Sequence, residues 1–101
     1  MSEIIMNGTK ATVKLTEDVT ATTEKGIRQS LKELLSGGIT ELIVDLAAVQ
    51  MVDSVGIGLF ISAHNSIRKI GGVLVLVNAS KDLADLFTNM RLNQHFTINP
   101  A

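Results

Sequence analysis

A strand is predicted to give way to a helix at Asp53-Ser54-Val55-Gly56-Ile57-Gly58. Upstream, residues 41–46 read Glu-Leu-Ile-Val-Asp-Leu, which is typical of a buried strand, and Met51-Val52 is expected to return the chain to the apolar layer. Downstream, apolar residues recur at helical spacing, namely Phe60, Ala63, Ile67 and Ile70. Ser54 is therefore expected at or near the N-cap of this helix, a position that serine and aspartate favour.

The second half of the chain alternates apolar runs with helical periods. Strands are predicted over 41–46, over 73–77 and near 96–98, and helices over 55–70 and 81–90. Gly71-Gly72 is expected to end the first of these helices, and Ser80 to cap the second. Right-handed crossovers would make the three strands parallel, and the unbroken Val/Leu run at 73–77 predicts a central strand buried on both faces.

The first half of the chain predicts a hairpin followed by an amphipathic helix. Apolar residues 4–6 and the alternating residues 11–15 flank Asn7-Gly8, a dipeptide that suits a tight hairpin turn. From about Thr20 to Ser36, leucine and isoleucine recur on one helical face, and Gly37-Gly38 supplies a stop. Gly26 inside this helix costs about 1 kcal/mol relative to alanine, which predicts either fraying or a close packing contact there.

These elements predict a single α/β domain over residues 1–101. A mixed β-sheet is opened by an N-terminal β-hairpin and continues as βαβαβ, with helices packed on the sheet. A chain of 101 residues, 46% hydrophobic and 19% charged, has the size and composition of one domain with its own core.

Charge and composition exclude several classes of protein. Nine basic and ten acidic residues give a formal net charge of −1, without the basic cluster that binding to nucleic acid requires. Cysteine is absent, which excludes disulfides. The N-terminus lacks the pattern of a signal peptide, and no apolar run reaches the length of a membrane span. We expect a cytoplasmic protein that makes no membrane contact and is a monomer when free.

Residues that could carry chemistry are few, and we expect neither an enzyme nor a bound cofactor. His64 and His95 lack a supporting motif, and the aspartates do not have the spacing of a metal site. Gly56-x-Gly58 is not a dinucleotide fingerprint, because its third glycine would fall at Ile61. The two glycines fit either close approach by another protein or tight packing of the helix on the sheet.

The order of the elements, the Asp-Ser-x-Gly-[Ile/Leu]-Gly string and the helix after it resemble the STAS domain of bacterial anti-sigma factor antagonists. The similarity covers nearly the whole chain. In that family, the serine after the aspartate is phosphorylated by an anti-sigma factor that is also a serine kinase, and a serine phosphatase reverses the modification. This serine corresponds to Ser54. The chain departs from the family at Val55, where a second Ser or Thr is usual, and at residues 15–20, which lack the Gly-Glu-[Leu/Ile]-Asp pattern.

The resemblance implies partner switching, in which the unmodified protein binds the kinase and phosphorylation of Ser54 releases it. A phosphate adds about −1.5 to −2 charges beside Asp53, and the N-terminus of the helix is expected to accommodate it. The expected partner-binding residues gather around the serine, with two more from neighbouring loops: Asp53, Ser54, Val55, Gly56, Ile57, Gly58, Thr20 and Asn78. Which of Val55 and Ile57 faces outward is open, and Thr20 and Asn78 also fit capping and turn roles.

Two other functions stay open. One is a STAS scaffold or transport-associated subunit that is never phosphorylated, in which Ser54 only caps the helix. The other is a phosphocarrier or receiver-like protein, which would need a histidine or aspartate as the phosphate acceptor.

Overall fold

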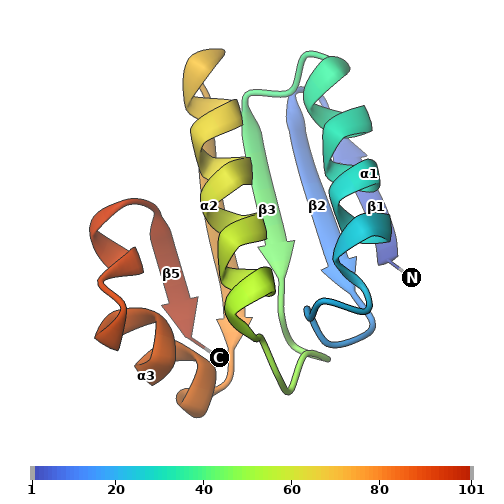
Figure 1. Cartoon of the computed structure of the whole chain (residues 1–101). Coiled ribbons are helices and arrows are strands. Elements are labelled where there is room, and N and C mark those ends of the chain that lie inside the picture. The colour runs from blue at the N-terminus through green and yellow to red at the C-terminus, as the bar shows by residue number, and fades with distance from the viewer. Residues whose placement is uncertain (1, 101) are drawn as a thin grey trace.

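Strands and helices alternate along the chain in the computed structural model, which describes residues 2–100 (Figure 1). The elements are β1 (Ser2–Asn7), β2 (Lys10–Leu15), α1 (Glu24–Ser36), β3 (Glu41–Asp45), α2 (Ser54–Lys69), β4 (Val73–Ala79), α3 (Lys81–Asn89), the 3-10 turn η1 (Leu92–Gln94) and β5 (Thr97–Pro100). The predicted α/β class and order of elements are confirmed.

The strands form one mixed sheet in the order β1-β2-β3-β4-β5. β1 and β2 are antiparallel, and the other neighbouring pairs are parallel. The hairpin turn lies one residue later than predicted, because Asn7 pairs with Lys10 and leaves Gly8 and Thr9 at the centre. Gly8 has φ +64°, and a glycine at the first central position suits a type II′ turn.

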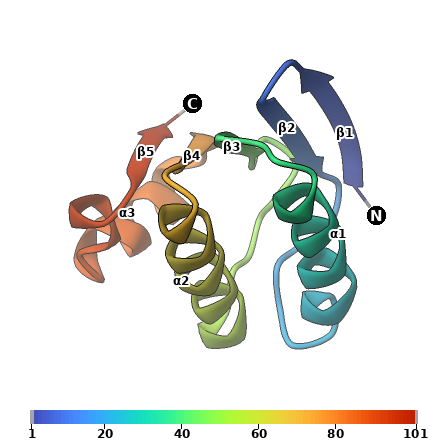
Figure 2. The same cartoon turned by 90° about the horizontal axis from the view of Figure 1, so that it is seen from above.

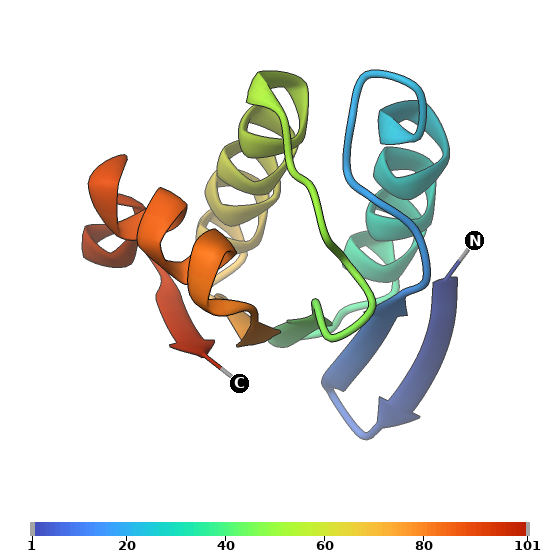
Figure 3. The ribbon, with the colours of Figure 1, turned by 90° about the horizontal axis from the view of Figure 1, so that it is seen from below.

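All three helices pack on the same face of the sheet (Figures 2 and 3). The sheet order follows the chain order without reversing, so each right-handed crossover falls on that face. Phe60 of α2 meets Phe87 of α3 edge to face, with ring centroids 6.1 Å apart, in the core beneath the sheet. Within residues 2–100, the opposite face of the sheet carries no helix.

The prediction that residues 73–77 are buried on both faces is therefore wrong. Leu74 and Leu76 point to the helices and are buried, but Val75 and Val77 on the other face are only half-buried. Val73 at the start of β4 is 51% exposed. An unbroken run of valine and leucine predicts a strand, but strand order decides whether helices cover one face of the sheet or both.

Helix α1 begins at Glu24, four residues later than predicted. Thr23 prevents an earlier start, because its hydroxyl accepts the Thr20 N–H and donates to the Asp18 carbonyl, which holds the segment in a turn. The close packing contact offered as one explanation for Gly26 is contradicted, since a Cβ there would meet no atom within 4 Å.

The predicted helix ends are confirmed at two further positions. Gly71 has φ +80°, beyond the last turn of α2, and the Ser80 hydroxyl accepts the Leu83 N–H as the cap of α3. Ile70 does not continue the buried face of α2 as predicted, because it lies past the end of the helix and is exposed.

Candidate functional site

The predicted site lies where two loops and the start of α2 meet, at the carboxyl ends of the parallel strands. One loop, 16–23, leads from β2 to α1, and the other, 46–53, leads from β3 to α2. In Figure 3 the second loop runs between α1 and α2. Val19 joins the loops, since its N–H donates to the Met51 carbonyl (3.0 Å) and its carbonyl accepts the Asp53 N–H (3.2 Å).

Two aspartates tie these loops together through backbone N–H groups. The Asp18 Oδ1 atom accepts from Gln50 at 2.9 Å and from Met51 at 3.1 Å. The Asp53 Oδ2 atom accepts from Ala21 at 3.0 Å. Each carboxylate therefore bridges segments more than 30 residues apart, which gives the turn before α2 a defined geometry.

Asp53 is also the N-cap of α2. Its Oδ1 atom accepts the Gly56 N–H at 2.9 Å, and its backbone is extended, as an N-cap requires. Hydrogen bonds from the Gly56 and Ala21 N–H groups lower the pKa of Asp53 below its ordinary value of 3.8. A negative charge therefore stands at the start of the helix at neutral pH.

Ser54 is the first residue of α2, one position after the cap, and it is exposed. Because Asp53 makes the capping hydrogen bond, the serine is not needed for that role. Ser54 lies at the surface of the molecule. The turn that carries it is fixed by the hydrogen bonds from the Asp53 N–H to the Val19 carbonyl and from the Gly56 N–H to the Asp53 carboxylate.

The alternative between Val55 and Ile57 is resolved by burial. Val55 is 41% exposed, whereas Ile57 is 4% exposed and belongs to the core. Ile57 therefore cannot contribute its side chain to a contact surface, contrary to expectation. Met51, which was expected to return to the apolar layer with Val52, is instead 57% exposed. The Met51 backbone is hydrogen-bonded to Asp18 and Val19 of the other loop, and no local sequence pattern signals the exposure of its side chain.

The two glycines of the motif have different surroundings. A Cβ on Gly56 would lie 2.2 Å from the Val19 carbonyl oxygen, so this glycine permits tight packing of the helix against the loop. Gly56 is buried and is not part of the outer surface. Gly58 is exposed, and a Cβ there would meet no atom within 4 Å. Its surface is open to another protein.

Thr20 and Asn78 lie at the same edge of the sheet, and the side chain of each has a hydrogen-bond partner of its own. The Thr20 hydroxyl accepts the Thr22 N–H at 3.3 Å within the turn before α1. Asn78, with φ +58°, donates from Nδ2 to the Asp45 carboxylate at 3.1 Å. Asn78 is therefore tied to the end of β3 and not to the turn that carries Ser54.

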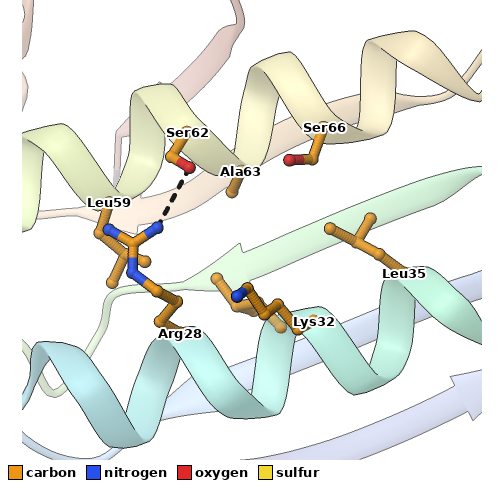
Figure 4. Close-up of a pocket in the computed structure, with 8 residues that line it drawn as sticks. Arg28, Lys32, Leu35, Leu59, Ser62, Ala63 and Ser66 are labelled. Carbon is orange, nitrogen blue, oxygen red and sulfur yellow. Dashed lines mark hydrogen bonds between the residues drawn. The ribbon is translucent and has the colours of Figure 1, made fainter.

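A groove between α1 and α2 is too small to be a ligand site (Figure 4). Its volume is about 30 Å³, close to that of one water molecule. Arg28 crosses it from α1 and donates to the Ser62 hydroxyl of α2 at 3.1 Å. Within residues 2–100, no three side chains are grouped as metal ligands, and no helix is both long and apolar enough to cross a membrane.

The two histidines lie near each other and away from this edge. His64 is on α2 and His95 follows η1, with ring centroids 6.3 Å apart. The sequence predicts no relation between His64 and His95, because no local pattern links positions 31 residues apart.

Comparisons with known proteins give the family and the fold. The family model described as the STAS domain matches residues 3–101. No curated protein matches the chain. Among solved structures, an anti-sigma factor antagonist from Mycobacterium paratuberculosis has a TM-score of 0.88 and 17% identity, and the match covers 100% of this chain and 86% of that one.

In two further structures, the same fold makes up most of one chain and a small part of the other. The anti-sigma factor antagonist SpoIIAA, in its unphosphorylated form, has a TM-score of 0.79 and 17% identity over 100% of this chain and 89% of its own. The murine anion transporter Slc26a9 has a TM-score of 0.80 and 18% identity over 96% of this chain, but the match spans only 17% of the transporter. At these identities, the similarities show the fold alone.

Proposed function

The chain belongs to the STAS domain family, and from that premise we propose that it is a bacterial anti-sigma factor antagonist that acts by partner switching. In its unmodified form it binds an anti-sigma factor with serine kinase activity. Phosphorylation of Ser54 by that kinase releases it, and a serine phosphatase restores binding. The protein is the substrate in this cycle and not an enzyme, and the ATP-dependent kinase places the cycle in the cytoplasm.

The observation that carries the proposal is that Ser54 is exposed on a turn whose geometry is fixed by hydrogen bonds of Asp53. A kinase must bring ATP to the hydroxyl, which a buried serine would not allow. Asp53 makes the capping hydrogen bond to Gly56, so modification of Ser54 does not remove the cap of α2. The same observation weighs against the alternative in which Ser54 serves only as a cap.

The surface around Ser54 has features of a docking site. Met51 and Val55 expose apolar side chains on either side of the serine in the sequence, and Gly58 offers a surface without a side chain one turn along the helix. Apolar contacts around a small hydroxyl would support binding of the unmodified form.

The charge of Asp53 explains why phosphorylation would release the partner. The phosphate adds about −1.5 to −2 charges next to a carboxylate that already occupies the helix N-terminus. The helix dipole still favours a negative charge there, so the folded state tolerates the modification. A partner that covers Ser54 would have to bury this charge, and each 1.4 kcal/mol of that penalty weakens binding about tenfold.

Measurement of phosphate transfer tests the proposal. The wild-type protein and the variant Ser54→Ala are incubated with a candidate anti-sigma kinase and ATP, and their intact masses are compared. We expect one added phosphate on the wild type and none on the variant. Failure of every kinase encoded beside the gene to modify the wild type would favour a STAS scaffold, whereas acid-labile phosphate on histidine or aspartate would favour a phosphocarrier.

A charge variant separates the electrostatic argument from loss of the fold. Ser54→Asp is expected to lose kinase binding by more than about tenfold while keeping the wild-type circular dichroism spectrum and melting temperature. Ser54→Thr is the matched control and should still bind. Tight kinase binding by Ser54→Asp, measured by calorimetry, would contradict the charge mechanism.

A further inference from the structure

A second candidate site lies between the later half of α2 and the segment that joins η1 to β5. His64, His95 and Phe96 line two adjoining cavities there. The first, of about 220 Å³, also has Arg68 and Thr97 in its wall. The second, of about 330 Å³, extends towards α3. We call this region the histidine cleft and define it by His64, Arg68, His95, Phe96 and Thr97.

The polar groups of the histidine cleft suit an anion. Arg68 carries a permanent positive charge with several N–H donors, and Thr97 adds a hydroxyl. Among the residues that the structure describes, no aspartate or glutamate lines either cavity. A metal cation would be repelled by Arg68 and would find no carboxylate ligand, so two imidazoles are not enough to favour it.

His64 is set up to donate a hydrogen bond. Its Nδ1 atom is buried and has no hydrogen-bond partner among the described residues. An unpaired N–H group is costly to bury, so we infer that the neutral ring keeps its proton on Nε2. Burial first, and then the charges of Arg68 and His95, lower the pKa of His64 below 6.5, so the ring is neutral at pH 7.

The remaining wall of the first cavity is apolar. Val73 and Leu74 at the start of β4 contribute to it, and Phe96 packs with its ring centroid 5.3 Å from that of His64. A ligand that fits both parts carries an anionic head and a small apolar body. The first cavity therefore has an apolar side and a polar side, and sites for small molecules likewise set convergent polar groups against apolar side chains.

We propose that the histidine cleft binds a small organic oxyanion, with its phosphate or carboxylate group held by Arg68, His64 and His95 and its apolar part against Leu74 and Phe96. His64 lies ten residues beyond Ser54 on α2, which is about 15 Å along the helix. The cleft is therefore separate from the phosphorylation surface, and its occupancy does not depend on Ser54.

Titration followed by NMR tests this site in the full chain. The protein has two histidines, so their ring resonances can be assigned with single variants. Phenyl phosphate and benzoate are added separately at pH 7 in a buffer free of phosphate and carboxylate. We expect both rings to shift together and to saturate with one of the probes, and the probe that binds more tightly identifies the head group. Shifts that never saturate with either probe would overturn the proposal.

Two adjacent cations of α2 provide matched variants. Arg68→Gln removes a charge from the cleft, whereas Lys69→Gln removes the same charge one residue further on, outside both cavities. Loss of a charge-assisted hydrogen bond should weaken binding roughly tenfold in Arg68→Gln, with less than about a twofold change in Lys69→Gln. Equal weakening in the two variants would show attraction by net charge alone and would contradict a built site. Both residues are exposed, so both variants are expected to fold.

Discussion

Two glycines separated by one residue in α2 are predicted to respond to alanine in opposite directions. A Cβ at Gly56 would collide with the Val19 carbonyl, so Gly56→Ala should lower the free energy of unfolding by about 1–3 kcal/mol. At Gly58 the space is open and the helix would gain the better propensity of alanine, so Gly58→Ala should raise it by up to about 1 kcal/mol. Urea denaturation measures both, and destabilisation by Gly58→Ala would show a packing role that the structure lacks.

His64 is predicted to make the protein less stable in mild acid. Its pKa is lowered on folding by burial, Arg68 and His95, so the unfolded chain binds the proton more readily. The free energy of unfolding should therefore fall as the pH drops from about 6.5, the pKa in the unfolded chain, to the lower pKa in the folded protein.

The variant His64→Gln should lose this part of the pH dependence. Urea midpoints compared between pH 7.5 and pH 5 measure the effect. His95→Gln keeps His64 and removes only the smallest of the causes that lower its pKa, so that variant should keep most of the pH dependence. An identical slope in the wild type and in His64→Gln would mean that the imidazole titrates alike in both states.

Among the elements, the loops before α1 and α2 act as one unit because Asp18 bridges them. Asp18→Ala removes the acceptor of the Gln50 and Met51 N–H groups, and we expect a loss of about 1–3 kcal/mol of stability. Amide hydrogen exchange at these two residues should accelerate more than exchange in β3. The matched control is Asp85→Ala, whose carboxylate pairs with exposed Lys81 at 3.7 Å and should matter little. Unchanged exchange at Gln50 and Met51 would show that the hydrogen bonds of Val19 and Asp53 hold the loops without Asp18.

Helix α2 is the element that connects the two proposed sites. Its first turn carries the exposed Ser54 beside the Asp53 cap, and its later turns carry His64 and Arg68. Its buried side, with Phe60 and neighbouring residues, anchors it on the sheet. Both sites therefore lie on one rigid helix, so phosphorylation of Ser54 at its start is not expected to unfold the turns that carry His64 and Arg68.

For the whole molecule, the single helical layer predicts unequal costs on the two faces of the sheet. Val44 in β3 faces the helices and is 1% exposed, whereas Val75 in β4 is half-buried on the open face. Val44→Ala should cost about 2–3 kcal/mol and Val75→Ala about 1 kcal/mol or less. Chemical denaturation compares the two variants directly. Equal losses would mean that something covers the open face in solution.

Local patterns along the chain were enough for the order of elements, the mixed sheet and the turn at Ser54. Alternation in 11–15, helical spacing from Phe60 to Ile67 and the cap at Ser80 each depend on interactions within a few residues, which the sequence shows directly. The same locality explains the errors at the ends of elements. The start of α1 was wrong because Thr23 bonds to Asp18, outside the helical period.

Only the tertiary structure decides which side chains are exposed and which distant residues come together. The choice between Val55 and Ile57, the exposure of Met51 and the pairing of His64 with His95 all depend on which segments pack together over tens of residues. The open face of β4 follows from strand order and the hand of the crossovers, which no single run of residues encodes. The spacing of apolar side chains predicts whether a segment is a helix or a strand. How deeply that segment is buried depends on which other segments pack against it, and tertiary packing determines those neighbours.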